Sequence, residues 1–199
     1  MTPPPRFQGW QAAELAADRR WIFRADPGLA DAAAAELETW LAPLRRELLH
    51  GWGVAWVRGL GDLPEPRLRR LFLAIGRAIG QPDTTYGELY DVIDSGVSHL
   101  ERAIPISQTR AATSMHTDSS QRAIHPRWVG LACVRQAAEG GGSRLASAVA
   151  AHDHLAQHDP VALRRLHRCY HRDLVTPGSD RQRQQRLANR FPIVRQAAD

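Results

Sequence analysis

The side chains whose types and spacing best suit metal chemistry are His116 and Asp118, which are separated by one residue in the segment 114–120. On a strand, residues two apart project to the same face, so this imidazole and carboxylate would reach one metal ion. With a second histidine from elsewhere, such a pair forms the three-ligand set that leaves open positions on non-heme iron(II). The spacing alone is common, and a histidine hydrogen-bonded to a neighbouring acid is the alternative interpretation.

The basic residues exclude several other chemistries. All 26 lysine-plus-arginine positions are arginine, so a phosphate-loop lysine, a Schiff base and a pyridoxal attachment are ruled out. The net charge of +5 would suit nucleic acid, but the arginines are spread beside acids or on helix-like faces, and we expect no nucleic-acid partner. A small metal hydrolase that uses His116 and Asp118 is another possible function, but no His-Glu-x-x-His or Cys-x-x-Cys pattern supports it.

The cysteines and the N-terminal segment predict the location of the protein. Cys133 and Cys169 lie in apolar or helical contexts, and residues 1–6 lack the apolar stretch of a signal peptide. No apolar run reaches the roughly 18 residues that a membrane span requires. We therefore expect a cytoplasmic protein with no membrane partner.

The first half of the chain has the pattern of helices around one short strand. Residues 29–49 carry apolar side chains at helical spacing with charged residues on the opposite face, which predicts an amphipathic helix. Glycines at 51 and 53 end it, and residues 54–57 predict a short buried strand. A second helix is expected to begin near Pro66, because proline suits a first turn, and to end at Gly80.

After residue 82 the pattern changes to short apolar runs separated by glycine, serine and proline, which is typical of strands. A glycine turn is expected at residues 139–142. We predict strands or extended pieces at 90–93, 128–134 and 143–147, and helices at 148–157 and 161–170. Helices followed by a sheet with inserted helices predict an α+β fold, and the length suits a single domain over residues 1–199.

The order of these segments resembles the taurine dioxygenase (TauD/TfdA-like) family along residues 51–194. The resemblance is carried by the early strand, the helix that ends in glycine before Gln81-Pro82, the His116-Thr117-Asp118 motif, the next strand, the glycine turn with its strand, and a late apolar segment. In this sequence they are residues 53–59, 71–82, 116–118, 128–134, 140–145 and 191–194.

The resemblance implies an oxygenase that depends on iron(II) and 2-oxoglutarate and hydroxylates a small molecule or amino-acid-like substrate with O2, releasing succinate and CO2. It implies that His116 and Asp118 are metal ligands and catalytic residues. It also implies that Ser143, where threonine is more usual, helps hold the co-substrate carboxylate. The alternative for Ser143 is a serine that only satisfies a glycine-rich hairpin.

The departure from the family lies at the C-terminus. The family's second histidine and the arginine that anchors 2-oxoglutarate should follow on later strands, yet no later histidine has a strand-like setting that matches. His152, His154 and His158 lie in or beside a polar helix. His171, followed by Arg181 and Arg183, is the nearest candidate, although its surroundings look helical.

The fold that the resemblance implies is a double-stranded β-helix, a distorted jelly roll with N-terminal helices on one sheet. We expect the chain to hold its N-terminal portion, to be incomplete at the C-terminus, and to lack tight iron binding as it stands. Unpaired sheet edges would then need a longer chain or another chain, including a homo-oligomer, to cover them. The alternative function is a catalytically inactive remnant that acts as an interaction or structural module.

Overall fold

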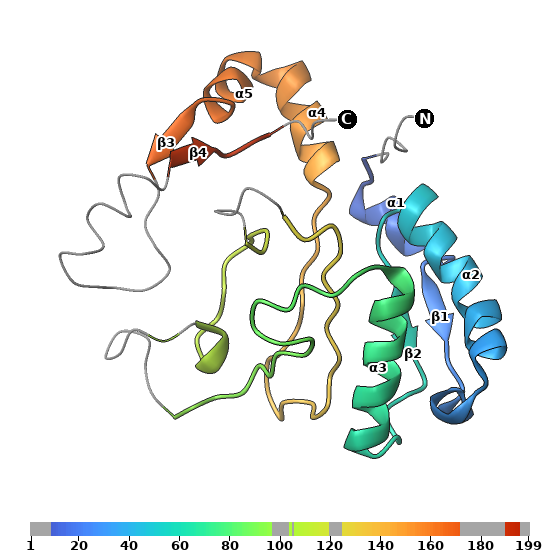
Figure 1. Cartoon of the computed structure of the whole chain (residues 1–199). Coiled ribbons are helices and arrows are strands. Elements are labelled where there is room, and N and C mark those ends of the chain that lie inside the picture. The colour runs from blue at the N-terminus through green and yellow to red at the C-terminus, as the bar shows by residue number, and fades with distance from the viewer. Residues whose placement is uncertain (1–8, 97–103, 105, 120–124, 172–189, 196–199) are drawn as a thin grey trace. The chain divides into compact units, whose positions relative to one another are not determined.

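The computed structural model describes residues 9–96, 104, 106–119, 125–171 and 190–195 (Figure 1). The chain divides into two compact units: the first takes residues 1–88 and 130–157, and the second takes residues 89–129 and 158–198. Both helices and short strands are present, so the protein is a mixed helix-and-sheet structure. None of the helices in these residues is long and apolar enough to cross a membrane.

The first unit begins with three short elements and a long helix. They are α1 (Ala12–Ala17), β1 (Ile22–Arg24), the 3-10 helix η1 (Pro27–Asp31) and α2 (Ala34–His50). Asp26 caps η1, because its carboxylate accepts a hydrogen bond of 2.7 Å from the backbone N–H of Gly28. The helix predicted over 29–49 is therefore confirmed from residue 34 onward, and its first residues form η1 instead.

A parallel two-stranded ribbon and a second long helix follow. β2 (Trp56–Arg58) pairs with β1 so that Ile22 lies opposite Trp56 and Arg24 opposite Arg58. α3 (Glu65–Ile79) has a proline in its first turn and ends before Gly80, as predicted, although Gly80 is extended rather than left-handed. The strand predicted over 54–57 is confirmed, although it begins two residues later and ends one residue later, which is within the usual uncertainty of element ends. The prediction that this strand is buried is wrong, because Trp56 and Arg58 are exposed.

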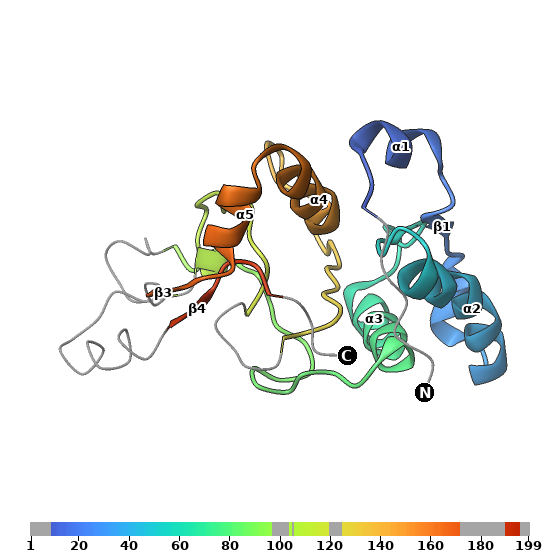
Figure 2. The same ribbon diagram turned by 90° about the horizontal axis from the view of Figure 1, so that it is seen from above.

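The core includes the contact between α2 and α3. The two helices lie next to each other in Figure 2, whereas Figure 1 shows β1 and β2 between them. Leu41 and Leu44 of α2 are almost completely buried, and α3 contributes Leu68, Leu71 and Ile75. These positions recur every three to four residues, so each helix presents one apolar stripe to its neighbour. Tight packing of such stripes is the main source of stability for amphipathic helices.

The described residues between α3 and the next α-helix are mostly irregular. It contains η2 (Ile106–Gln108), and none of its described residues belongs to a strand. The strands predicted at 90–93 and 128–134 and the extended piece at 143–147 are therefore wrong as sheet elements. The physical reason is that a strand requires backbone partners from elsewhere, which an apolar run cannot supply by itself.

The last elements are α4 (Ala148–His158), α5 (Pro160–Leu166), β3 (Cys169–His171) and β4 (Arg190–Pro192). β3 and β4 pair antiparallel, with Tyr170 opposite Phe191. The helix predicted at 148–157 is confirmed. The helix predicted over 161–170 is wrong beyond Leu166, because His167 and Arg168 turn the chain into β3. The double-stranded β-helix stays a prediction.

Candidate metal centre

His116 and Asp118 face each other in the second unit, with 3.1 Å between His116 Nε2 and Asp118 Oδ1. Both side chains are about half exposed, at 54% and 48%. The prediction that they lie on a strand is wrong, since the backbone here is irregular and enters a turn at Asp118. The side chains nevertheless converge as expected, since His116 Nε2 and Asp118 Oδ1 are in contact.

A backbone contact fixes the orientation of the His116 ring. Its Nδ1 lies 2.8 Å from the carbonyl oxygen of Ser114. Since a carbonyl can only accept, Nδ1 must carry the proton and donate it. If the ring is neutral, Nε2 then carries a lone pair that faces the Asp118 carboxylate. Metal-binding histidines are oriented in the same way by hydrogen bonds from their second nitrogen.

Two electron-rich atoms that face each other in this way suit a bound cation. Metal–nitrogen and metal–oxygen bonds of about 2.0–2.2 Å, the lengths that zinc makes, would place two ligands about 3 Å apart at the right angle of an octahedral ion and about 3.4 Å apart at a tetrahedral angle. A proton between the two atoms would satisfy them equally well as an ion pair. Within the described residues, no group of three or more His, Cys, Asp or Glu side chains is placed to hold a metal. The pair therefore fits two arms of a metal site.

Ser143 follows a glycine turn in the first unit. Gly140 and Gly141 have positive φ values of 75° and 71°, in agreement with the turn predicted there. Ser143 itself is exposed and lies on irregular backbone. Because the His116–Asp118 pair belongs to the other unit, the place of Ser143 beside that pair stays a prediction.

The later histidines have two different settings. His154 and His158 are exposed on α4, and His152 is half-buried there, with its Nδ1 3.1 Å from the Asp153 carboxylate. His171, by contrast, lies on β3 directly opposite Arg190 of β4. The expectation of a helical setting for His171 is therefore wrong. His171 nevertheless does not join the His116–Asp118 pair in a three-ligand group.

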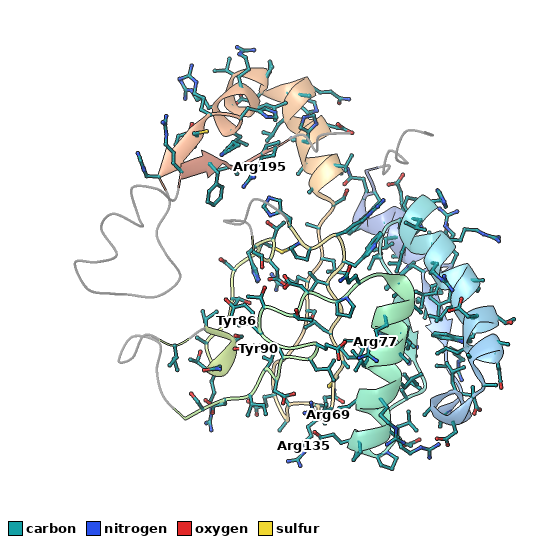
Figure 3. The ribbon with its side chains drawn as sticks, in the orientation of Figure 1. Arg69, Arg77, Tyr86, Tyr90, Arg135 and Arg195 are labelled. Carbon is teal, nitrogen blue, oxygen red and sulfur yellow. The ribbon has the colours of Figure 1, made fainter. Side chains whose placement is uncertain are left out.

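A polar network in the second unit was not foreseen from the sequence. The side chain of Tyr90, labelled in Figure 3, lies beside η2, where its hydroxyl accepts a hydrogen bond of 3.1 Å from Gln108 Nε2. Ser95 N–H donates to the Gln108 carbonyl at 2.8 Å. Asp94 pairs with Arg110. This network ties the loop near residue 94 to the segment that leads into His116.

The hydrogen bond from the Gly96 backbone N–H and the charge of Arg110 hold the pKa of Asp94 below its ordinary range. The turn at Asp94-Ser95-Gly96 was not predicted from the sequence, although aspartate, serine and glycine are typical turn residues and could have indicated it. The partner of Asp94, Arg110, had no such signal, since the contact spans 16 residues.

The first unit also contains a shallow groove of about 580 Å³. It is lined by residues of η1 and α2 and by Asp26 before them: Asp26, Gly28, Leu29, Glu36, Thr39 and Trp40. None of the residues predicted from the sequence to bind metal or co-substrate is among them.

One comparison with known proteins gives a match. The family model described as taurine catabolism dioxygenase TauD, TfdA family matches residues 12–197. No curated protein and no solved structure matches the chain.

Proposed function

Because the chain belongs to the taurine catabolism dioxygenase TauD, TfdA family, we propose that it is an iron(II)- and 2-oxoglutarate-dependent oxygenase whose metal ligands include His116 and Asp118. Members of this family are typically dioxygenases of this type. The proposal includes the family's jelly-roll fold, with residues 1–199 as the N-terminal portion of a single oxygenase-type domain. It also includes a small molecule or amino-acid-like compound as the substrate.

The observation that carries the proposal is the orientation of the His116–Asp118 pair. Nδ1 of His116 faces the Ser114 carbonyl, which leaves Nε2 as the nitrogen that faces Asp118 Oδ1, 3.1 Å away. An imidazole and a carboxylate are two of the three ligands in the facial set used by non-heme iron(II) oxygenases. Their partial exposure leaves room for a co-substrate to approach.

Iron(II) and 2-oxoglutarate, when bound, supply the oxidation: O2 and 2-oxoglutarate yield succinate and CO2, and one oxygen atom enters a substrate C–H bond. The chain's own residues bind and orient. His116 holds its ring fixed through Ser114, and Asp118 contributes negative charge that favours a divalent cation. Ser143 is proposed to donate a hydrogen bond to a carboxylate of 2-oxoglutarate.

The first test is metal binding at the pair. Manganese(II) or iron(II), added anaerobically to the 199-residue chain, should broaden the NMR signals of the His116 ring before those of other histidines. His116→Ala and Asp118→Ala should each weaken binding by more than the roughly 10- to 100-fold that loss of an outer-shell partner costs. Selective broadening at another histidine, or variants that bind the metal as tightly as the natural chain, would overturn the metal assignment.

The chain contains a matched control for this experiment. His152 and Asp153 form a second imidazole–carboxylate contact, also of 3.1 Å and with similar exposure, on the helix α4. If proximity of a histidine and an acid were enough, His152→Ala would reduce binding as strongly as His116→Ala. We expect His152→Ala to leave the affinity unchanged.

The second test is turnover of 2-oxoglutarate to succinate. In a longer protein that completes the metal site, we expect turnover that His116→Ala and Asp118→Ala abolish, whereas Ser143→Ala loses one hydroxyl hydrogen bond, worth about 0.5–1.5 kcal/mol, and costs far less. Selective metal binding without any succinate would reject the enzymatic part and favour a non-catalytic interaction or structural module. Equal damage by Ser143→Ala would give that residue a larger role than proposed.

A further inference from the structure

The backbone immediately after Asp118 has an unusual conformation. Ser119 has φ of 53°, and it is the one residue other than glycine with positive φ in the part of the chain that the structure describes. L-residues with a Cβ atom rarely adopt this left-handed region, because Cβ approaches the carbonyl oxygen. Something outside Ser119 must therefore stabilise the turn that carries Asp118.

His125 makes the contact that can do this. Its Nδ1 lies 3.2 Å from the carbonyl oxygen of Ser119. The carbonyl can only accept, so Nδ1–H of His125 donates. The His116–Asp118 pair is thus flanked by two imidazole-to-carbonyl hydrogen bonds, one to Ser114 before it and one to Ser119 after it.

We propose that His125 is a positioning residue that holds the Ser119 carbonyl, keeps the left-handed turn in place and thereby directs the Asp118 carboxylate at His116 Nε2. Without this hydrogen bond, Ser119 relaxes to negative φ. The peptide that joins Ser119 to Asp118 then rotates, and the carboxylate turns away from the imidazole. This inference rests on the proposed metal site, but it concerns the geometry of the turn, which exists without metal.

Glycine at position 119 gives a direct way to test this role. Glycine adopts positive φ about as readily as negative φ, so Ser119→Gly removes the strain that His125 is proposed to oppose. His125→Ala should then matter less in the Ser119→Gly background than in the natural sequence. His125→Asn is the conservative variant, because its amide N–H can occupy nearly the same place as Nδ1–H.

The affinity for manganese(II) is the first readout. Loss of one neutral hydrogen bond corresponds to roughly a two- to tenfold change, so His125→Ala should weaken binding by about that factor, and His125→Asn should restore most of it. In the Ser119→Gly background, His125→Ala should change the affinity for manganese(II) by less than about twofold. An equal loss in both backgrounds, or no rescue by asparagine, would overturn the proposal.

The second readout uses the metal-free protein. A positive φ gives a strong intraresidue NOE between Hα and HN of Ser119, which His125→Ala should weaken and His125→Asn should keep. If His125→Ala leaves this NOE unchanged, the positioning role is wrong even when metal binds at His116. If the NOE behaves as expected and the natural chain binds no metal, the positioning role stands and the proposed function fails.

Metal-induced broadening separates a positioning residue from a ligand. His116 should broaden first, and His125 should follow only at higher metal concentration. If both rings broaden together and His125→Asn abolishes binding, His125 is a ligand and the positioning proposal is overturned. Tryptophan fluorescence of each variant, dominated by residues 10–56 where five of the six tryptophans lie, checks that the helical core still folds.

Discussion

The helical region of residues 12–79 and the irregular segment, defined as the described residues within 86–145, differ in the exposure of their apolar side chains. In the helical region leucines and isoleucines form the core, and the buried apolar residues of the described chain all lie between Leu15 and Ile75, with the exception of Phe191. In the irregular segment comparable side chains face solvent. They include Tyr86, Val92, Ile93, Met115, Val129, Leu131 and Leu145.

The difference shows which interactions each kind of element needs. A helix satisfies its backbone within its own segment, so α2 and α3 need only each other to bury their apolar stripes. A strand needs a neighbour for its backbone and a second layer for its side chains. An apolar segment such as residues 128–134 therefore stays exposed when no strand is paired with it. Exposed apolar stretches of this kind are typical of surfaces that associate.

The largest expected effect comes from truncating one leucine side chain in each region. Leu41 is 0% exposed and Leu131 is 78% exposed. Leu41→Ala should lower the free energy of unfolding by about 2–5 kcal/mol, because it removes buried methyl groups and leaves a cavity. Leu131→Ala should change it by no more than about 0.5 kcal/mol. Urea unfolding followed by tryptophan fluorescence and far-UV circular dichroism measures both.

A costly Leu131→Ala would break the comparison. It would mean that residues 128–134 are packed in solution, either against another copy or against residues of this chain. Sedimentation of the natural chain and of Leu131→Ala distinguishes these two cases, because only association between copies depends on concentration.

The sequence predicts the helices of this fold better than its strands. Helices at α2, α3 and α4 were predicted to within a few residues, because helical periodicity is a local property. The strand at β3 was mistaken for helix, since Leu166-His167-Arg168 continues the helical pattern of α5 and only the pairing of Cys169–His171 with Arg190–Pro192 reveals the change. Pairing partners that lie 19 or more residues apart leave no periodic signal.

The candidate site shows a similar limit. His116 and Asp118 were identifiable because both lie within three residues and their side-chain chemistry is specific. The hydrogen bonds that orient them, from His116 to the Ser114 carbonyl and from His125 to the Ser119 carbonyl, depend on backbone angles that residue types do not specify. The left-handed conformation at Ser119 was not predictable, because serine carries no preference for it.

An intermediate effect is expected at the buried end of α2. Glu47 is 7% exposed, and its carboxylate accepts a hydrogen bond of 2.7 Å from the Trp52 backbone N–H and lies 3.5 Å from Arg20 Nε. Gly51 permits this approach, because a Cβ atom there would lie 2.2 Å from Glu47 Oε1. The carboxylate therefore joins the helix end to the loop that precedes β2.

Glu47→Ala should lower the free energy of unfolding by about 1–3 kcal/mol, because it leaves the Trp52 N–H without this acceptor. Glu47→Gln keeps an acceptor oxygen and loses only the attraction to a half-exposed arginine, so it should cost less than about 1 kcal/mol. Urea unfolding of the two variants gives the ranking. If glutamine proved as costly as alanine, the charge rather than the hydrogen bond would stabilise this end of the helix.

The smallest effect is expected at Asp94, in the irregular segment. The pKa of this carboxyl is lowered mainly by the hydrogen bond from the Gly96 N–H and then by the neighbouring Arg110 guanidinium. A lowered pKa means that the folded form favours the charged carboxylate, so the stabilisation is present above the ordinary aspartate pKa of about 3.9 and is lost as the pH falls below it. Arg110 is 89% exposed, so solvent and salt weaken the attraction.

The Gly96 amide signal should therefore follow a titration whose midpoint is lower in the native chain than in urea, while the amides of α2 and α3 stay unchanged over the same pH range. Asp94→Asn keeps an oxygen for the Gly96 N–H but cannot titrate, so the step should disappear and the loop should keep its contact at acidic pH. Equal midpoints in native and denatured protein would show that the Asp94 contacts are not populated in solution. Hydrogen exchange of the backbone amides in α2 and α3 gives a further check. If these amides lose their protection over the pH range in which the Gly96 signal shifts, the irregular segment and the helical core unfold as one unit, and the two regions are not independent.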